Sequence, residues 1–217
     1  MLVTTEAIVL RARKQGETSK IVTLYTLAYG KLNAIAKGAR EMKSKFGGGL
    51  EMFARSNIVL YKRDKSDALN LLSKAETLNS HSGILRSLKK IEVATAIHEL
   101  LLHAMHDEEA NAELYQSLSH VLDAIASSEE SAAPILTAQF YLAFARIMGF
   151  EIDFSELRYS PKLIEMLHAI ESWSGGTIPL DARQEEQLRA FFMSYFAEHL
   201  PGVSRRSLRS AGVFSSL

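Results

Sequence analysis

The hydrophobic period of this chain changes once, near residues 79–83, and this change constrains the fold more than any other feature of the sequence. Before it, short runs rich in β-branched and aromatic residues predict five strands, at 7–10, 21–26, 32–37, 57–61 and 68–75. Such closely spaced short strands predict a small closed or nearly closed barrel, and an SH3-like barrel fits their number almost as well.

After the change, apolar residues recur at the spacing of helix faces. The periodicity predicts helices at 84–105, 114–125, 136–147, 161–173 and 188–199. Pro134 and Gly149 mark the start and end of the third, and Pro201-Gly202 ends the last. The expected fold class is therefore α+β, with a five-stranded barrel domain at residues 1–80 and an all-α domain at 81–217.

The charge changes sign at the same place, although the net charge of the 217 residues is zero. Residues 1–80 hold 14 Lys and Arg against 7 Asp and Glu, a net charge of +7. Residues 81–217 hold 11 against 18, a net charge of −7. This division favours two units that face different partners, with chance clustering of surface charge as the alternative.

The strongest functional signal is the segment 31–45, KLNAIAKGAREMKSK, which has a local charge of +4 and runs into Phe46 and three glycines. Phosphate backbones are bound by several cations along a groove, because counterion release supplies affinity. If the first two strands neighbour the third, their cations border the same face. The predicted nucleic-acid-binding residues are Arg11, Arg13, Lys14, Lys20, Lys31, Lys37, Arg40, Lys43 and Lys45. The alternative is a solvated basic loop whose glycines serve only a turn.

Aromatic residues of the first half could add stacking surfaces for bases. They are Tyr25, Tyr29, Phe46, Phe53 and Tyr61. Most aromatic residues of a small barrel belong to its core, so we expect one or two at most to stack.

No pattern predicts an enzyme, a metal site or a cofactor. The chain has no cysteine, no Walker loop, no G-x-G-x-x-G after a strand and no G-x-S-x-G. His98-Glu99 and His103 resemble a zincin motif, but its histidines are five residues apart and do not converge. Glu99, His103 and His106 share a helix face, which leaves a metal hydrolase as a weaker alternative. With no membrane-length apolar run and no basic signal region, the expected location is cytoplasmic.

The stripe from Leu188 to Phe196 contains four aromatic residues in nine. Core packing is its expected use, and a groove for an apolar peptide of a partner is the alternative. Nearby arginines could pair with an acidic peptide. The residues assigned to this speculative partner site are Phe192, Phe196, Arg205, Arg206 and Arg209.

Three stretches together resemble the RecO family of recombination mediators. The opening 6–11 and 16–26 resembles the first two strands of the family, and 29–31 with 36–40 and 43–50 resembles its most distinctive segment. The closing 206–210, RSLRS, is a weaker match. The resemblance implies an OB-fold barrel followed by a helical domain. Many members carry a four-cysteine zinc module in the helical domain, whereas this chain has a short polar link at 151–160, so we expect no zinc.

The resemblance also implies a function without enzymatic activity. It implies binding of single- and double-stranded DNA, annealing of complementary strands, and a nucleoid-associated location. The implied partners are RecR, the C-terminal tail of the single-strand-binding protein and, indirectly, RecA, which is loaded onto DNA. The alternative is a protein-interaction adaptor whose basic barrel binds an acidic partner.

Overall fold

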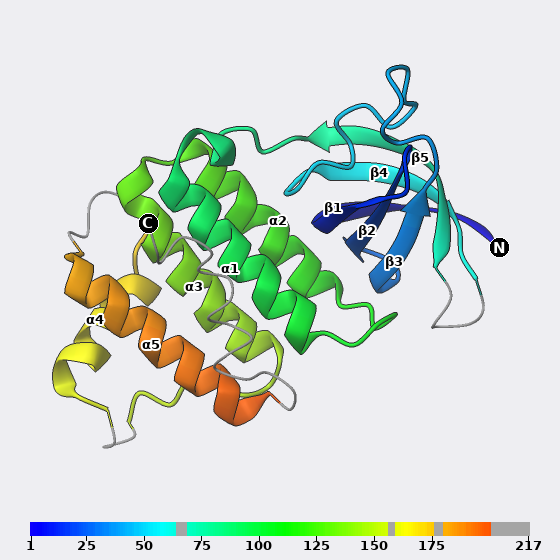
Figure 1. Ribbon diagram of the computed structural model, residues 1–217. Helices are drawn as coiled ribbons and strands as arrows, with labels where there is room; N and C mark the ends of the chain where they lie inside the picture. Colours follow the sequence, from blue (N-terminus) through cyan, green and yellow to red (C-terminus); the bar gives the residue numbers. More distant parts are fainter. Residues whose placement is uncertain (64–68, 156–158, 176–179, 201–217) are drawn as a thin grey trace. The chain divides into compact units, whose positions relative to one another are not determined.

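The structure is a computed structural model that describes residues 1–63, 69–155, 159–175 and 180–200 (Figure 1). Its contacts divide the chain into two compact units. One consists of Met1–Ser82 with Leu101–Ser119, and the other of Gly83–Leu100 with the described residues from His120 onward. The expected division at residue 80 stays a prediction.

The first unit contains the five strands of a closed barrel. They are β1 (Leu2–Gln15), β2 (Ser19–Thr26), β3 (Gly30–Ala36), β4 (Arg55–Tyr61) and β5 (Asn70–Asn79). The strand order is β1-β2-β3-β5-β4, with β3 and β5 parallel and the other pairs antiparallel. A five-stranded barrel of this kind is an OB-fold. The predicted fold class is therefore confirmed, and the five strands fall where the sequence indicated, although their ends differ: β1 is much longer than predicted, and β5 runs from residue 70 to 79 instead of 68 to 75.

Alternation along the strands fills the barrel. On β3, Leu32, Ala34 and Ala36 are buried in the core, while the residues between them face outward. Strand β1 pairs with β4 through its first half and with β2 through its second half. The register shifts between Val9 and Arg11, which is the position of a β-bulge. Because a bulge bends a strand, β1 can cross from one neighbour to the other.

The segment between β3 and β4 closes one end of the barrel. Phe46 and Leu50 are both buried and belong to the same core as the strands. Gly49 lies where a Cβ atom would be 3.1 Å from the Ala75 Cβ and from the Ser56 Oγ. A basic, glycine-rich stretch is therefore held by an apolar anchor.

Residues 101–119 belong to the barrel unit because they pack against the outside of β2, β3 and β4. The ring of Tyr115 stacks on that of Tyr25, with centroids 6.4 Å apart. The Arg55 guanidinium donates a hydrogen bond to the Ser119 hydroxyl at 2.8 Å. This segment includes the last turn of α1 (Leu88–Ala104) and the first turns of α2 (Ala112–Ser127).

The second unit is helical. It contains η1 (Ile84–Arg86), the remainder of α1 and α2, η2 (Glu130–Ala132), α3 (Ala133–Ile147), α4 (Pro161–Glu171) and α5 (Ala182–His199). Helix α3 ends at Ile147, and Gly149, two residues later, has a φ of +82°, which lets the Phe150 N–H donate to the Ala145 carbonyl. Helix α5 begins with a capping box between Asp181 and Gln184. The predicted helices are confirmed in place, but several ends differ: the first α-helix begins at residue 88, the fourth ends at residue 171 and the last begins at residue 182.

Aromatic packing holds α3 against α5. Phe192 and Phe196 are each 2% exposed, and both contact the ring of Tyr141 at centroid distances of 5.2 and 5.3 Å. In the described part of the chain, no helix is long and apolar enough to cross a membrane.

Candidate nucleic-acid interface

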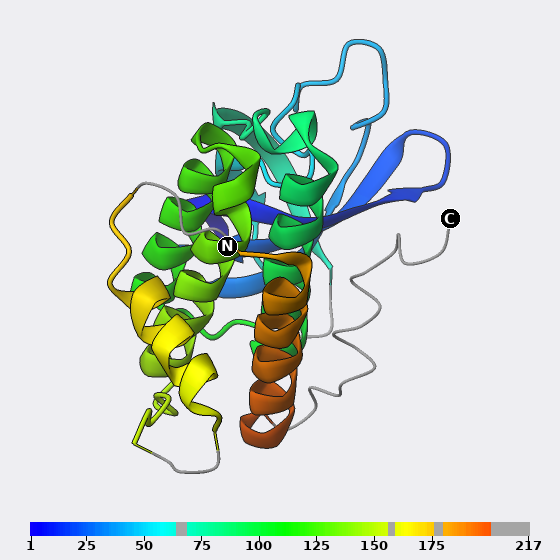
Figure 2. The same ribbon diagram turned by 90° about the vertical axis from the view of Figure 1, so that its left-hand side faces the viewer.

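All of the predicted cations except Lys31 lie toward one end of the barrel, where the turn between β1 and β2 lies beside the segment that follows β3 (Figure 2). Arg40 joins the two: its N–H donates to the Thr18 carbonyl at 2.9 Å. Its guanidinium donates to the carbonyls of Gly16 and Glu17 at 3.1 and 2.9 Å. Two basic segments that are distant in sequence therefore form one surface.

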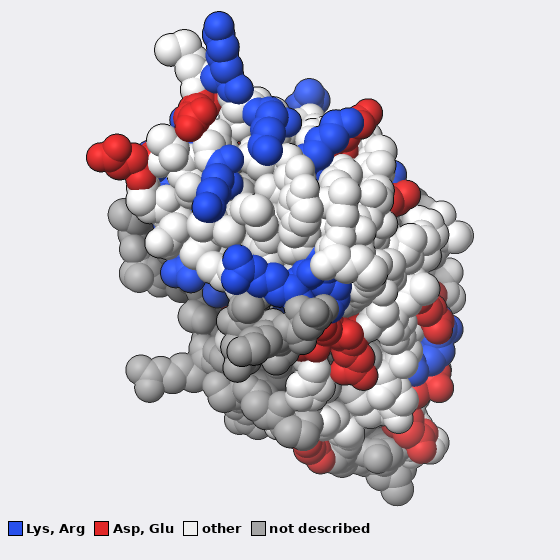
Figure 3. Space-filling model, turned by 90° about the vertical axis from the view of Figure 1, so that its right-hand side faces the viewer, with Lys and Arg blue, Asp and Glu red and all other residues white. Residues whose placement is uncertain are grey.

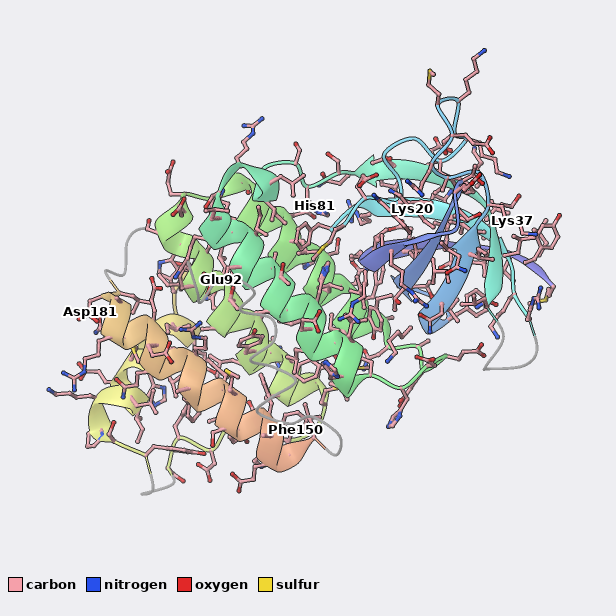
Figure 4. The ribbon with its side chains drawn as sticks, in the orientation of Figure 1. Lys20, Lys37, His81, Glu92, Phe150 and Asp181 are labelled. Carbon is pink, nitrogen blue, oxygen red and sulfur yellow. The ribbon has the colours of Figure 1, made fainter. Side chains whose placement is uncertain are left out.

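We call the exposed cations of this surface the hairpin-end cations. They come from the end of β1, from the residue after β3 and from the segment that follows it: Arg13, Lys14, Lys37, Arg40, Lys43 and Lys45. Because β2 pairs Lys20 with Ala36, Lys20 and Lys37 lie at the same end of neighbouring strands (Figure 4). Figure 3 shows Lys and Arg side chains spread over the described part of the barrel.

Lys43 and Lys45 extend from an anchored backbone. The buried ring of Phe46 fixes the segment, and the Lys45 ammonium lies 5.3 Å from the centroid of that ring. The ammonium groups remain exposed on either side of Ser44. Such cations can bind a phosphate with little loss of backbone entropy, because the backbone is already ordered.

Arg11 and Lys20 differ in their surroundings at this surface. Arg11 is exposed on the outer face of β1, opposite Thr23 of β2. Lys20 lies directly across from Lys14, and its ammonium forms an ion pair with Glu51 at 2.8 Å. Since like charges in opposed positions repel, Glu51 relieves this contact and partly neutralises Lys20.

Lys31 lies apart from the other predicted cations, at the opposite end of β3. Its side chain is 13% exposed, and its ammonium contacts Asp107 at 3.3 Å and donates to the Leu102 carbonyl at 3.0 Å. Lys62, which the sequence did not single out, contacts Glu108 at 2.7 Å in the same way. The acidic segment 107–109 therefore neutralises these two lysines.

The five aromatic residues of the barrel differ in how much of each side chain is exposed. Tyr25, Phe46 and Phe53 are buried, and Tyr29 is half-buried with the Lys62 ammonium 6.0 Å from its ring. Tyr61 is 50% exposed. The expectation that most of these rings form core is therefore met by three of the five.

Burial also changes the acidity of the rings under the acidic segment. It raises the pKa of Tyr25 well above its usual value, and the charge of Glu109 adds to the effect. The pKa of Tyr115 is raised in the same direction by burial and then by Glu6. Both phenols therefore stay protonated above the pH at which an exposed tyrosine ionises.

The remaining candidate residues do not form a site. Helix α1 ends at Ala104, so His106 is not on the helix that carries Glu99 and His103, and the expected shared face is wrong. Among the described residues, no group of three His, Asp or Glu side chains could hold a metal ion.

The assigned partner residues fall into two sets. Phe192 and Phe196 are buried in the helical core, which is the expected use of the stripe. Arg205, Arg206 and Arg209 lie outside the described residues. The partner site stays a prediction.

The chain is similar to known proteins over most of its length. Two family models match it, the recombination protein O N-terminal domain at residues 1–81 and the recombination protein O C-terminal domain at residues 85–157. A DNA repair protein RecO from Thermoanaerobacter sp. (strain X514) is 34% identical over 69% of this chain and 58% of its own length. The protein of the same name from Salinibacter ruber is 31% identical over 87% of this chain and 72% of its own length.

The chain spans about three fifths of the length of these curated relatives: 58% of the Thermoanaerobacter protein, and 60% of a DNA repair protein RecO from Chlorobium limicola. The first family model covers the OB-fold barrel, with its basic surface between β3 and β4. The second begins shortly before α1 and covers the helices up to the link after α3. With both domain models matched in order, and a relative that is 31% identical over 72% of its own length, the chain belongs to the recombination protein O (RecO) family of DNA repair proteins.

Proposed function

We propose that this chain binds single- and double-stranded DNA through the hairpin-end cations and acts in repair as a recombination mediator without enzymatic activity. The observation that carries this proposal is the Arg40 bridge, which brings two basic segments together on an ordered surface. Arg40 itself is exposed, and so are the other hairpin-end cations, Arg13, Lys14, Lys37, Lys43 and Lys45.

The chemistry of annealing fits a surface of this kind. Two complementary strands repel one another through their phosphates, and cations that replace condensed counterions screen this repulsion. Contacts to phosphates leave the base edges free to pair. Annealing then needs neither a nucleotide nor a metal, because base pairing itself supplies the driving free energy.

Family membership supports the partners that we propose. They are RecR, the C-terminal tail of the single-strand-binding protein, and RecA, which acts downstream on the DNA. We assign the protein partners to the helical part of the chain, where residues 81–217 carry a net charge of −7 and would not attract DNA.

A double charge reversal tests the DNA-binding surface. Lys43→Glu with Lys45→Glu should weaken binding of single-stranded DNA and lower the slope of log affinity against log salt by about 1.4, or about 0.7 per lost phosphate contact. The matched control is Lys162→Glu with Arg183→Glu, which reverses two exposed cations on α4 and α5. Fluorescence anisotropy titrations at several salt concentrations give both slopes.

The outcome separates the DNA proposal from an adaptor that binds an acidic protein. An unchanged affinity and slope in the Lys43/Lys45 variant would remove these residues from the DNA surface. Strand annealing on DNA coated by the single-strand-binding protein, with no nucleotide or metal added, tests the mediator role. Folded protein that leaves such strands unannealed contradicts it.

A further inference from the structure

Tyr61 is the most exposed aromatic residue of the barrel. It lies at the end of β4, next to the connection between β4 and β5, and half of its surface is exposed. Leu60, the residue before it, lies in the core, and Lys62, the residue after it, contacts Glu108. The ring faces outward because the side chains of a strand alternate and Leu60 faces inward.

Strand register places Tyr61 in a row of apolar side chains on the outside of the barrel. Tyr61 is opposite Leu2 of β1 and Leu71 of β5, Leu71 is opposite Ile35 of β3, and Ile35 is opposite Ile21 of β2. We call these five residues the outer apolar row.

The adjacent residues show that this row faces outward. Val3, Leu60, Leu72, Ala34 and Val22 each follow or precede a member of the row, and all five lie in the barrel core. Leu2 is 56% exposed and Met1 beside it 76%, so the end of the row near Tyr61 is open to solvent. Neighbouring strands are about 4.8 Å apart, so the members of the row lie side by side. The exposed part of the row is Tyr61 and Leu2, with Leu71 and Ile35 half-buried beside them, whereas Ile21 at the far end is 8% exposed.

Cations lie at both ends of the row. Arg13 of β1 is opposite Ile21 and is exposed, and Lys37 follows Ile35 by two residues and is also exposed. Arg63, two residues after Tyr61, is exposed at the other end. An apolar strip with an aromatic ring, bordered by cations, is complementary to a single strand, whose bases are flat and apolar and whose phosphates are anionic. A duplex does not offer its base faces to such a strip.

We propose that Tyr61, with Leu2 and Leu71 beside it, is a stacking platform for the bases of single-stranded DNA. This inference rests on the proposed DNA-binding function and deepens it. The hairpin-end cations hold phosphates of either form of DNA, and the outer apolar row selects the single-stranded form.

Ring removal tests the platform. Tyr61→Ala should weaken binding of oligo-dT of about 15 nucleotides by roughly 5- to 150-fold, because stacking on one aromatic side chain contributes about 1–3 kcal/mol per base. Duplex affinity should be unchanged. The salt slope for the single strand should also be unchanged, because no phosphate contact is lost. Tyr61→Phe should retain nearly full affinity, since the ring remains.

Two further variants make the result specific. Leu78→Ala removes another exposed apolar side chain of β5, 49% exposed and outside the row, and should leave both affinities unchanged. Tyr61→Trp places an indole at the platform, and its fluorescence should be quenched when oligo-dT is added but not when duplex is added, after the Trp173 signal of the parent protein is subtracted.

The outcomes distinguish a failure of the stacking platform from a failure of the proposed DNA-binding function. If the parent protein binds DNA with a steep salt dependence and Tyr61→Ala binds oligo-dT equally well, the platform is refuted and the DNA-binding function stands. An equal loss for single strand and duplex, with a flatter slope, also overturns the platform, because Tyr61 then acts through phosphate contacts. If the parent protein binds no DNA at low salt, the proposed function fails first.

Discussion

Gly30 is the residue at which the packing of the acidic segment on the barrel can be measured. Its φ is +64°, and an added Cβ atom would lie 2.1 Å from the Glu109 carbonyl oxygen and 2.4 Å from its carbon. Both are backbone atoms, so the contact cannot be relieved by rotating a side chain. Gly16 offers a matched comparison, because its φ is +59° and its Cβ would meet nothing within 4 Å.

The free energies of unfolding of Gly16→Ala and Gly30→Ala should therefore differ by the free energy needed to displace the acidic segment 107–109. Left-handed backbone costs alanine about 1–2 kcal/mol, and a gain of roughly 0.4–1 kcal/mol through the unfolded state offsets part of it, so Gly16→Ala should cost about 1 kcal/mol. Gly30→Ala adds displacement of residue 109, which breaks the hydrogen bond from the Glu108 N–H to the Lys31 carbonyl at 2.9 Å. The backbone cost of about 1 kcal/mol, about 1 kcal/mol for that hydrogen bond and a similar amount for the lost packing together lower the free energy of unfolding by about 3 kcal/mol.

Urea denaturation measures the difference in the free energy of unfolding. At a slope of about 2 kcal/mol/M, the midpoint for Gly30→Ala should lie about 1 M below that for Gly16→Ala. Hydrogen exchange followed by mass spectrometry gives the local readout, and peptides that contain Glu108 should lose protection only in the Gly30 variant. Equal midpoints for the two variants, or full protection at residues 107–110 after Gly30→Ala, would refute the close packing on which this reasoning depends.

Three other predictions concern the interface and the core. Phe192→Ala should lower the free energy of unfolding by roughly 3–5 kcal/mol in a denaturant titration, because the ring is 2% exposed among other rings; a loss below about 1 kcal/mol contradicts the core assignment. Lys31→Gln should leave the salt slope for single-stranded DNA unchanged in anisotropy titrations, since Asp107 already neutralises this lysine; a drop of about 0.7 would show a phosphate contact. The raised pKa values of Tyr25 and Tyr115 mean that the folded state keeps protons that the unfolded state releases near pH 10. Their contribution to stability should be complete below that pH and decline as the pH rises toward the folded values, and unfolding midpoints that stay level from pH 9 to 11 would argue against it.

Local patterns predicted the barrel and the helices well because each rests on neighbouring residues. The alternation of Leu32, Ala34 and Ala36 is a property of seven residues, and strand β3 forms where it predicts. Element ends were predicted less well. Asn79 still belongs to β5, and the end of α1 at Ala104 separates His106 from the helix face that its spacing suggested. Ends depend on caps and on tertiary contacts, which spacing does not contain.

The site was predicted in composition but not in arrangement. Lys31 and Lys43 are equal members of one basic segment in the sequence, yet Asp107 neutralises the first and the second stays exposed. Asp107 is 76 residues further along the chain, and no local pattern connects it with Lys31. The role of Arg40 as a bridge to Gly16 and Glu17 was missed for the same reason.

The sequence by itself determined the barrel, the helices, the division of charge and the family, because periodicity, composition and motifs are properties of residues that are adjacent in the chain. Only the tertiary structure decided which cations remain available and which aromatic ring faces outward. Register across strands and contacts between distant segments decide those properties. Tyr61 and Tyr25 are both strand tyrosines in a basic half, but Tyr25 stacks on Tyr115 and is fully buried, whereas Tyr61 is 50% exposed.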